Sequence, residues 1–273
     1  MPAMIAHPGM PVWQTLVSRD LEAAKAFYAD VFGWEFQQVD DAYAVATKDG
    51  MPVAGLTGNP DSPGSRWGLY FYAQDVAGAH EAALKVGGQG LLGPTPTDDG
   101  TTRALLTDPT GALVSLKDSA DEQAIMAAGE PGTPVWFELT TTRNWEDTLE
   151  FYHQLTGLDI KVHGGGPSGR YATGDLDGHG VIGFWESDAT AGSPAPSQPV
   201  DSDGLWLLTW GVKDLKAALE AVKQRGGHVA QVSSGGDAPA ALILDAEGAA
   251  FQLAEVPEYD PAADDVHEPD VFA

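Results

Sequence analysis

The chain has 273 residues, no cysteine and a formal net charge of −26 at pH 7. The absence of thiols excludes disulfides, thiolate zinc sites and cysteine nucleophiles, and the negative charge disfavours nucleic acid, whose phosphates such a surface repels. No apolar run approaches the roughly 18 residues of a membrane span, and the N-terminus lacks the basic and apolar regions of a secretory signal, so we expect a cytoplasmic protein without a membrane partner.

A strand, a helix and a strand open the chain, after a loose lead-in over residues 1–10. Apolar residues spaced for one helical face predict a helix over residues 21–32, with Asp20 as its N-cap and Gly33 at its end. A hairpin around Asp49-Gly50 follows, because this dipeptide favours a tight turn between two strands.

The same order of elements returns three more times. Asp75, Asn144 and Asp214 are the expected N-caps of the later helices, the third of which is predicted over residues 146–155. The second and fourth helices both end at a Gly-Gly pair and precede an Asp-x-x-Gly turn. Their N-caps, Asp75 and Asp214, and their Gly-Gly pairs, which begin at Gly87 and Gly226, are both 139 residues apart. Such regularity indicates an internal repeat, and each unit reads β-α-β-β-β.

We therefore predict an α+β fold of four βαβββ units in two domains. The expected boundaries are an N-terminal domain over residues 1–118, a linker over 119–132 with a short helix near 121–128, a C-terminal domain over 133–257 and an acidic tail over 258–273.

The repeated motifs carry a resemblance to a known superfamily. Pro11-Val12-Trp13 is matched by Pro134-Val135-Trp136, and Phe27-Tyr28, with Phe-Gly-Trp after it, is matched by Phe151-Tyr152. Together with the Asp-x-x-Gly hairpins, these motifs resemble the vicinal oxygen chelate superfamily, which is the glyoxalase, bleomycin-resistance and extradiol dioxygenase group. The nearest form is the tandem two-domain glyoxalase-like protein of actinobacterial type, some of which are labelled hydroxylases. The resemblance implies two domains with curved mixed sheets, each built from two paired units.

The resemblance also implies where a divalent metal would be held, on the first and last strands of the units. Carried over to this sequence, the ligand positions are Trp13, Gly55, Gly68, Ser115, Trp136, Gly183, Leu207 and Gln252. None is His, Asp or Glu, which are the side chains that such metals require. We therefore expect no metal and no cofactor, which disfavours glyoxalase and dioxygenase chemistry, since both use the metal to polarise substrate oxygens.

Aromatic side chains are then the expected recognition surface. Strand alternation places Trp13 with Thr15, Tyr70 with Tyr72 and Trp136 with Glu138 on common faces. The predicted ligand-binding residues are Trp13, Thr15, Tyr70, Tyr72, Ser115, Trp136, Thr209 and Gln252. The alternative is that these aromatic residues only fill the sheets as core.

Glu138 is the predicted catalytic residue. A carboxylate beside an indole in a dry site has a raised pKa and can act as a general base. The alternative is an ordinary ion pair, for example with Arg170, or hydrogen bonds to the neighbouring backbone.

Three functions remain open from the sequence. The first is metal-independent binding of a small aromatic or polyketide-like metabolite, for sequestration or resistance. The second is a cofactor-free lyase, isomerase or hydroxylase-type tailoring enzyme in antibiotic biosynthesis that uses Glu138. The third is a scaffold whose sheets serve a homodimer.

Overall fold

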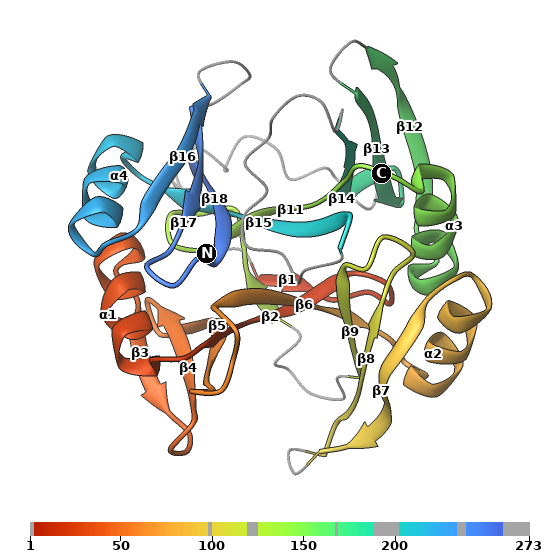
Figure 1. The fold of residues 1–273 in the computed structure, drawn as a ribbon, viewed down its shortest axis with the longest axis horizontal. Helices are drawn as coiled ribbons and strands as arrows, with labels where there is room; N and C mark the ends of the chain where they lie inside the picture. The colour runs from red at the N-terminus through yellow and green to blue at the C-terminus, as the bar shows by residue number, and fades with distance from the viewer. Residues whose placement is uncertain are drawn as a thin grey trace, which may run out of the picture.

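The structure is a computed structural model, and it describes residues 3–97, 100–118, 125–166, 169–187, 202–233 and 239–258. Two eight-stranded sheets lie one above the other, with two helices on each flank (Figure 1). This is the predicted α+β fold, in which four βαβββ units form two sheets. None of the helices in these ranges is long and apolar enough to cross a membrane.

The N-terminal sheet contains the first two units. Its strands are β2 (Pro11–Ser18), β3 (Glu35–Gln38), β4 (Tyr43–Lys48), β5 (Met51–Gly58), β6 (Arg66–Tyr72), β7 (Gln89–Pro96), β8 (Thr102–Thr107) and β9 (Leu113–Lys117). They lie in the order β3-β4-β5-β2-β6-β9-β8-β7. The central strands β2 and β6 are antiparallel, and each has a parallel partner from its own unit, β5 or β9.

The C-terminal sheet repeats this plan. Its strands are β11 (Pro134–Thr141), β12 (Asp159–Gly166), β13 (Gly169–Leu176), β14 (His179–Glu186), β15 (Gly204–Val212), β16 (His228–Ser233), β17 (Ala240–Leu244) and β18 (Ala250–Glu255). Their order is β12-β13-β14-β11-β15-β18-β17-β16. The central pair is now β11 and β15, so every position of one sheet has a counterpart in the other.

One helix follows the first strand of each unit: α1 (Leu21–Phe32), α2 (Val76–Lys85), α3 (Trp145–Thr156) and α4 (Leu215–Gln224). Asp20, Asp75 and Asp214 cap three of them as predicted, each accepting a hydrogen bond from a backbone N–H of the first turn. Gly33 ends α1 in the left-handed conformation, with φ of 68°.

The predicted cap of α3 is wrong in its mechanism. Asn144 precedes the helix, but its φ is +59° and its side chain makes no capping hydrogen bond. Its amide instead donates to the carbonyl of Pro109 in the other domain, at 2.9 Å. Tertiary contact has therefore replaced local capping at this end.

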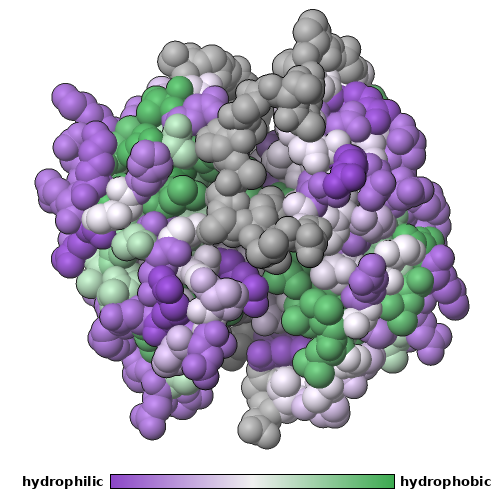
Figure 2. Space-filling model, in the orientation of Figure 1, coloured by the Kyte–Doolittle hydropathy of each residue, from purple (hydrophilic) through white to green (hydrophobic). Residues whose placement is uncertain are grey.

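The hydrophobic core lies between the two sheets. Alternate residues of the central strands point into it, so Leu16 and Leu69 from one sheet and Leu139 and Leu208 from the other are buried in one cluster. Helix α1 lies beside α4 and α2 beside α3, which closes the core at both flanks (Figure 1). Hydrophilic side chains cover both flanks on the outside (Figure 2).

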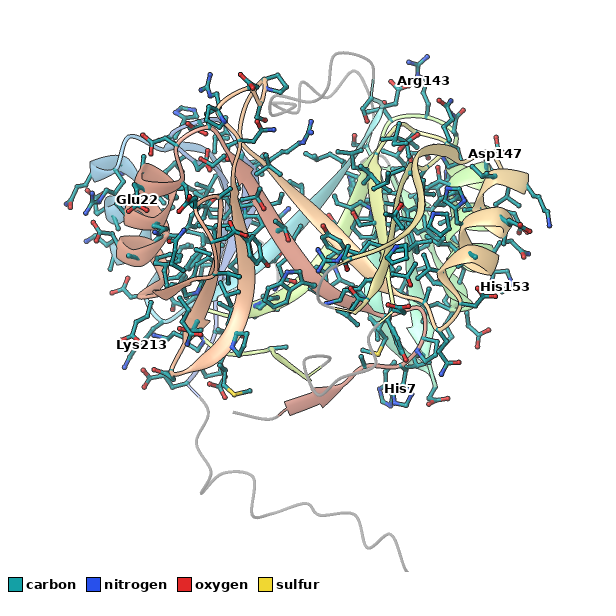
Figure 3. The ribbon with its side chains drawn as sticks, turned by 90° about the horizontal axis from the view of Figure 1, so that it is seen from below. His7, Glu22, Arg143, Asp147, His153 and Lys213 are labelled. Carbon is teal, nitrogen blue, oxygen red and sulfur yellow. The ribbon has the colours of Figure 1, made fainter. Side chains whose placement is uncertain are left out.

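Because the core occupies the facing sides, the other face of each sheet points away from the partner sheet. We call these the N-terminal and C-terminal inner faces, since the outer strands of each curved sheet rise around them. Figure 3 views the molecule from the side of the N-terminal sheet, with its central strands crossing between the two flanks.

Two buried hydrogen-bond networks, which we call the crossed clasps, tie the domains together. Tyr152 of α3 donates from its hydroxyl to Asp108 of the N-terminal domain at 2.9 Å, and the Trp206 indole donates to that hydroxyl. In the other half, Tyr28 donates to Asp245 at 3.0 Å, with Trp67 in the place of Trp206. The two networks use the same motif, because both aspartates are the first residues of the Asp-x-x-Gly turns.

Two smaller expectations need correction. The lead-in contains β1 (Ala3–Ile5), which pairs antiparallel with β10 (Ile125–Ala127). The helix expected near residues 121–128 is therefore wrong for residues 125–127, while residues 121–124 lie outside the described ranges. Of the expected acidic tail, only Glu258 is described.

Candidate functional site

The predicted residues of the first domain share the N-terminal inner face. Thr15 lies between Gly55 and Gly68 across the three adjacent strands. Trp13 is paired with Tyr70, and Tyr70 is paired in turn with Ser115. Strand alternation predicted which residues of each strand lie on the same side, and the pairing register shows that these residues of neighbouring strands form one surface.

The C-terminal inner face has the same geometry. Glu138 lies between Gly183 of β14 and Leu207 of β15. Trp136 is opposite Thr209, which is paired with Gln252, and the Thr209 hydroxyl donates to Gln252 Oε1 at 3.3 Å. Glu138 is thus the counterpart of Thr15.

The aromatic residues of the inner faces are only partly buried. Trp13, Tyr70, Tyr72 and Trp136 all keep solvent-accessible surface, although the two tyrosines also pack on the edge of the core. The fully buried aromatic residues, such as Trp210, lie on the opposite faces. This distribution favours a recognition surface over the alternative of core filling.

Two tyrosines that the sequence analysis missed complete these faces. An added Cβ at Gly183 would stand 2.7 Å from the Tyr171 hydroxyl and 2.8 Å from Trp136 Nε1, and one at Gly55 would meet the Tyr43 hydroxyl even more closely. Glycine is therefore needed beneath each tyrosine. A signal was available, because the tyrosine and the glycine flank the Asp-Gly turn at equal spacing in both repeats.

Glu138 occupies a desolvated position. Burial raises its pKa to about 7, and among the described residues it forms no ion pair or hydrogen bond. Burial, with the charge of Glu138 as a second cause, raises the pKa of Tyr171 to about 12. The neighbouring Trp136 indole lowers this pKa, but less than burial raises it. The Tyr171 hydroxyl therefore keeps its proton at neutral pH and can donate it to a bound oxygen atom.

The alternative of an ion pair between Glu138 and Arg170 is not what the structure shows. Arg170 instead bridges Glu186 and Glu146 and lies over the ring of Trp145, 5.3 Å from its centroid. This network keeps Arg170 at the surface, so it leaves the carboxylate of Glu138 uncompensated.

Further aromatic rings extend the C-terminal inner face. The rings of His163 and Trp185 lie 5.9 and 6.0 Å from that of Tyr171. His163 Nε2 is 2.8 Å from the Thr173 hydroxyl. His163 lies on β12.

The side chains of the inner faces do not fit a divalent metal. At the eight positions carried over from the resemblance, the oxygen donors are only Ser115 and Gln252. Across the described ranges, no group of three or more His, Asp or Glu side chains could hold a metal ion. We therefore derive no chemical step through a metal.

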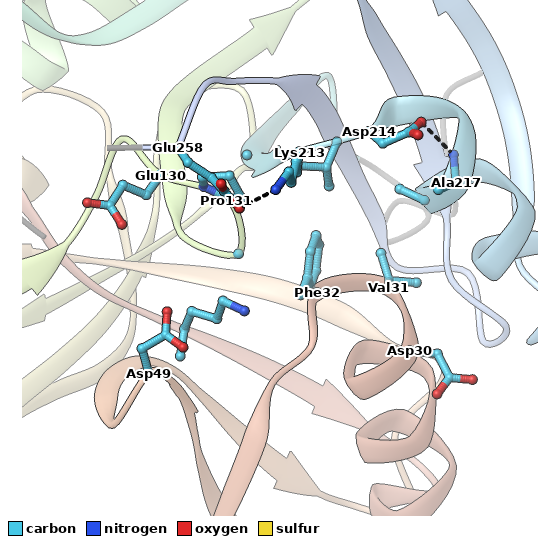
Figure 4. Close-up of a pocket in the computed structure, with 15 residues that line it drawn as sticks. Asp30, Val31, Phe32, Asp49, Glu130, Pro131, Lys213, Asp214, Ala217 and Glu258 are labelled. Carbon is cyan, nitrogen blue, oxygen red and sulfur yellow. Dashed lines mark hydrogen bonds and ion pairs between the residues drawn. The ribbon is translucent and has the colours of Figure 1, made fainter. Parts of the chain in front are cut away.

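A pocket of about 810 Å³ lies elsewhere, at the junction of the domains (Figure 4). Several of its charged side chains already have partners: Lys213 pairs with Glu258 at 2.7 Å, Asp214 caps α4, and Asp30 pairs with Arg225. It lies apart from Glu138 and the aromatic residues of the inner faces, so we place the candidate site on those faces.

The architecture defines a class of protein: tandem domains of paired βαβββ units, each with a curved eight-stranded sheet. Residues 5–116 match the family model of the Glyoxalase/Bleomycin resistance protein/Dioxygenase superfamily, so the chain carries a domain of this superfamily. The second sheet repeats the same topology. The resemblance seen in the sequence is thereby confirmed.

Known relatives and structures agree with this assignment. The chain is 28% identical over 264 residues to the glyoxylase-like protein CFP32 of Mycobacterium tuberculosis, covering 90% of this chain and 94% of that protein. It is 27% identical over 280 residues to the anthracycline biosynthesis protein DnrV of Streptomyces peucetius, covering 94% and 96%. The Mn(II)-bound glyoxalase from Novosphingobium aromaticivorans shares the fold, with a TM-score of 0.60, 18% identity and coverage of 94% and 85%.

Proposed function

We propose that this protein binds a small aromatic or polyketide-like metabolite on its inner faces without a metal. The observation that carries the proposal is the partly exposed aromatic surface of the C-terminal inner face, where Tyr171 and Trp136 lie over Gly183. Flat ring systems stack on such side chains, and stacking adds roughly 0.5–1.5 kcal/mol per ring pair beyond buried area.

The likeness to DnrV supports the chemical class. That protein is named for anthracycline biosynthesis, and anthracyclines are planar fused-ring molecules with several oxygen atoms. The C-terminal inner face offers rings for the planar part, and Tyr171, Thr209 and Gln252 for the oxygen atoms. Withdrawal of such a metabolite from solution would serve sequestration or resistance.

A calorimetric titration with daunorubicin, a planar anthracycline, tests the proposal. The variant Gly183→Ala pushes Tyr171 and Trp136 off their positions and should weaken binding by roughly three- to tenfold. The control is Gly93→Ala, since no atom lies within 4 Å of a Cβ added there. Equal affinity in both variants would contradict the proposal, as would a stoichiometric metal in the purified protein that is needed for binding.

Catalysis is the second candidate, and the raised pKa of Glu138 favours it. A carboxylate with a pKa of about 7 is matched to proton abstraction at neutral pH. In a cofactor-free isomerase or lyase, Glu138 would take a proton from carbon beside a carbonyl group. Thr209, Gln252 or the Tyr171 hydroxyl would then hold the resulting oxyanion.

The two candidates differ in what happens to the bound molecule. Binding alone predicts that chromatography recovers the metabolite unchanged after incubation. Catalysis predicts a product whose formation stops in Glu138→Gln, while this variant still binds the substrate. A rate that is the same with Glu138→Gln would exclude the catalytic role.

A further inference from the structure

We propose that the N-terminal inner face is a second site of its own chemistry, which takes an aromatic anion. Arg103 and Lys117 bring positive charge to this face beside Tyr70 and Tyr72, and Arg66 adds a cation at its other end. The inference rests on the proposed function, since it assumes that inner faces bind ring systems, and it adds the charge of the ligand.

The pairing register places the three cations on the N-terminal inner face. Lys117 is paired with Arg103 on one side and with Tyr72 on the other. The residues that alternate with them, Ala104 and Leu116, are buried in the core on the opposite face. Arg66 is exposed and lies opposite Val17 of β2, at the other end of the same face.

The counterpart positions in the C-terminal sheet carry no charge. The pair of Arg103 and Lys117 corresponds to Ala240 and Ala254, which are paired in the same way between β17 and β18. Arg66 corresponds to Leu205, which lies opposite Thr140. The two inner faces therefore share one geometry but have opposite chemistry, because the C-terminal one has an acid, Glu138, where the other has Thr15.

The concentration of cations is unusual for this chain. It has only 14 lysine and arginine residues against 40 acidic ones, yet two of the 14 face each other across one strand pair. Like charges in such a pair repel. Each of the two already makes an interaction of its own, and an anion bound between them would lower the remaining repulsion.

The neighbouring aromatic side chains indicate that the anionic ligand also carries an aromatic ring. Trp13, Tyr43, Tyr70 and Tyr72 are all partly exposed on this face. A ring that stacks on them while a carboxylate or sulfonate reaches Arg103 and Lys117 would use both features. A highly charged phosphate chain would leave the aromatic surface unused, so we infer an aromatic carboxylate or sulfonate.

A pair of probes that differ only in charge tests the inference. The affinities of 2-naphthoate and its neutral amide are measured by calorimetry on the full chain at pH 8. Two cations at a partly exposed site should favour the anion by about tenfold. Arg103→Gln/Lys117→Gln should remove this preference and leave the affinity for the amide within about twofold, whereas Lys216→Gln, an exposed control on α4, should change neither.

The outcomes separate the two proposals. Equal affinity for both probes, or a preference that survives in the double variant, refutes the aromatic-anion site alone. If neither probe binds, the aromatic-anion site is refuted, while the daunorubicin titration decides the proposed function separately. Should circular dichroism show that the double variant is unfolded, the single variant Lys117→Gln replaces it, and a reduced preference for the anion is then the expected result.

Discussion

The crossed clasps allow a comparison of two nearly identical substitutions in one molecule. Tyr152→Phe removes the hydroxyl that donates to Asp108 Oδ2 and accepts from Trp206. Tyr28→Phe removes the equivalent hydroxyl of the other clasp. Both tyrosines are completely buried, so neither change gains contact with water.

The two carboxylates differ in what remains after the substitution. Asp245 Oδ2 also accepts a hydrogen bond from the Ser65 hydroxyl at 3.1 Å, so it keeps a partner when Tyr28 is changed. Asp108 Oδ2 has only Tyr152 among the described residues, since Thr110 and Ala112 donate to its other oxygen. A buried acceptor without a partner costs about 1–3 kcal/mol, more when it is charged.

We therefore expect Tyr152→Phe to lower the free energy of unfolding by about 2–4 kcal/mol and Tyr28→Phe by about 1–2 kcal/mol. Urea unfolding at pH 7, followed by circular dichroism, measures both. The double variant Tyr28→Phe/Ser65→Ala should bring the second clasp to a loss like that of the first. An equal loss of stability in Tyr28→Phe and Tyr152→Phe, or a loss below about 0.5 kcal/mol in both, would show that the two clasps do not differ in this way.

Three further predictions concern single side chains. The folded-state pKa of Glu138 is raised, so its contribution to stability is complete below its unfolded pKa and is lost as the pH rises through about 7. Glu138→Gln should therefore be more stable than the unmodified protein at pH 8, by roughly 1–3 kcal/mol. A free energy of unfolding that does not change between pH 5 and 8 would contradict this. Asn144→Gly should be better tolerated than Asn144→Ala by about 1 kcal/mol, because only alanine is strained at φ of +59°, and thermal melts of the two variants measure the difference. Arg170→Gln should leave the pKa of Glu138 within about half a unit, because Arg170 pairs elsewhere; a large shift in the carboxyl titration by NMR would show that the two groups interact.

The sequence was sufficient where the determining interactions are local. The caps Asp20, Asp75 and Asp214 and the end of α1 at Gly33 each depend on neighbours within one helical turn. The side of the strand on which Glu138 lies followed from alternation alone. These features could be predicted because the chain carries them within a few residues.

The contacts that could not be predicted depend on residues that are distant in the sequence and adjacent in the fold. Tyr171 reaches Trp136 only because β13 and β11 both lie next to β14, and no short-range pattern specifies that neighbourhood. The same holds for Asn144, whose partner Pro109 belongs to the other domain. The partner of Arg170 also depends on strand register, because the hairpin of β13 and β14 places Arg170 opposite Glu186.

The back-to-back packing of the sheets separates two demands on the same strands. Along β2 or β11, every second residue packs in the core, and the residues between them lie on the inner face and do not contribute to the core. Selection can therefore rewrite one set without disturbing the other. In a scaffold of this kind, substitutions on the inner face of one domain leave both the core and the inner face of the other domain unchanged.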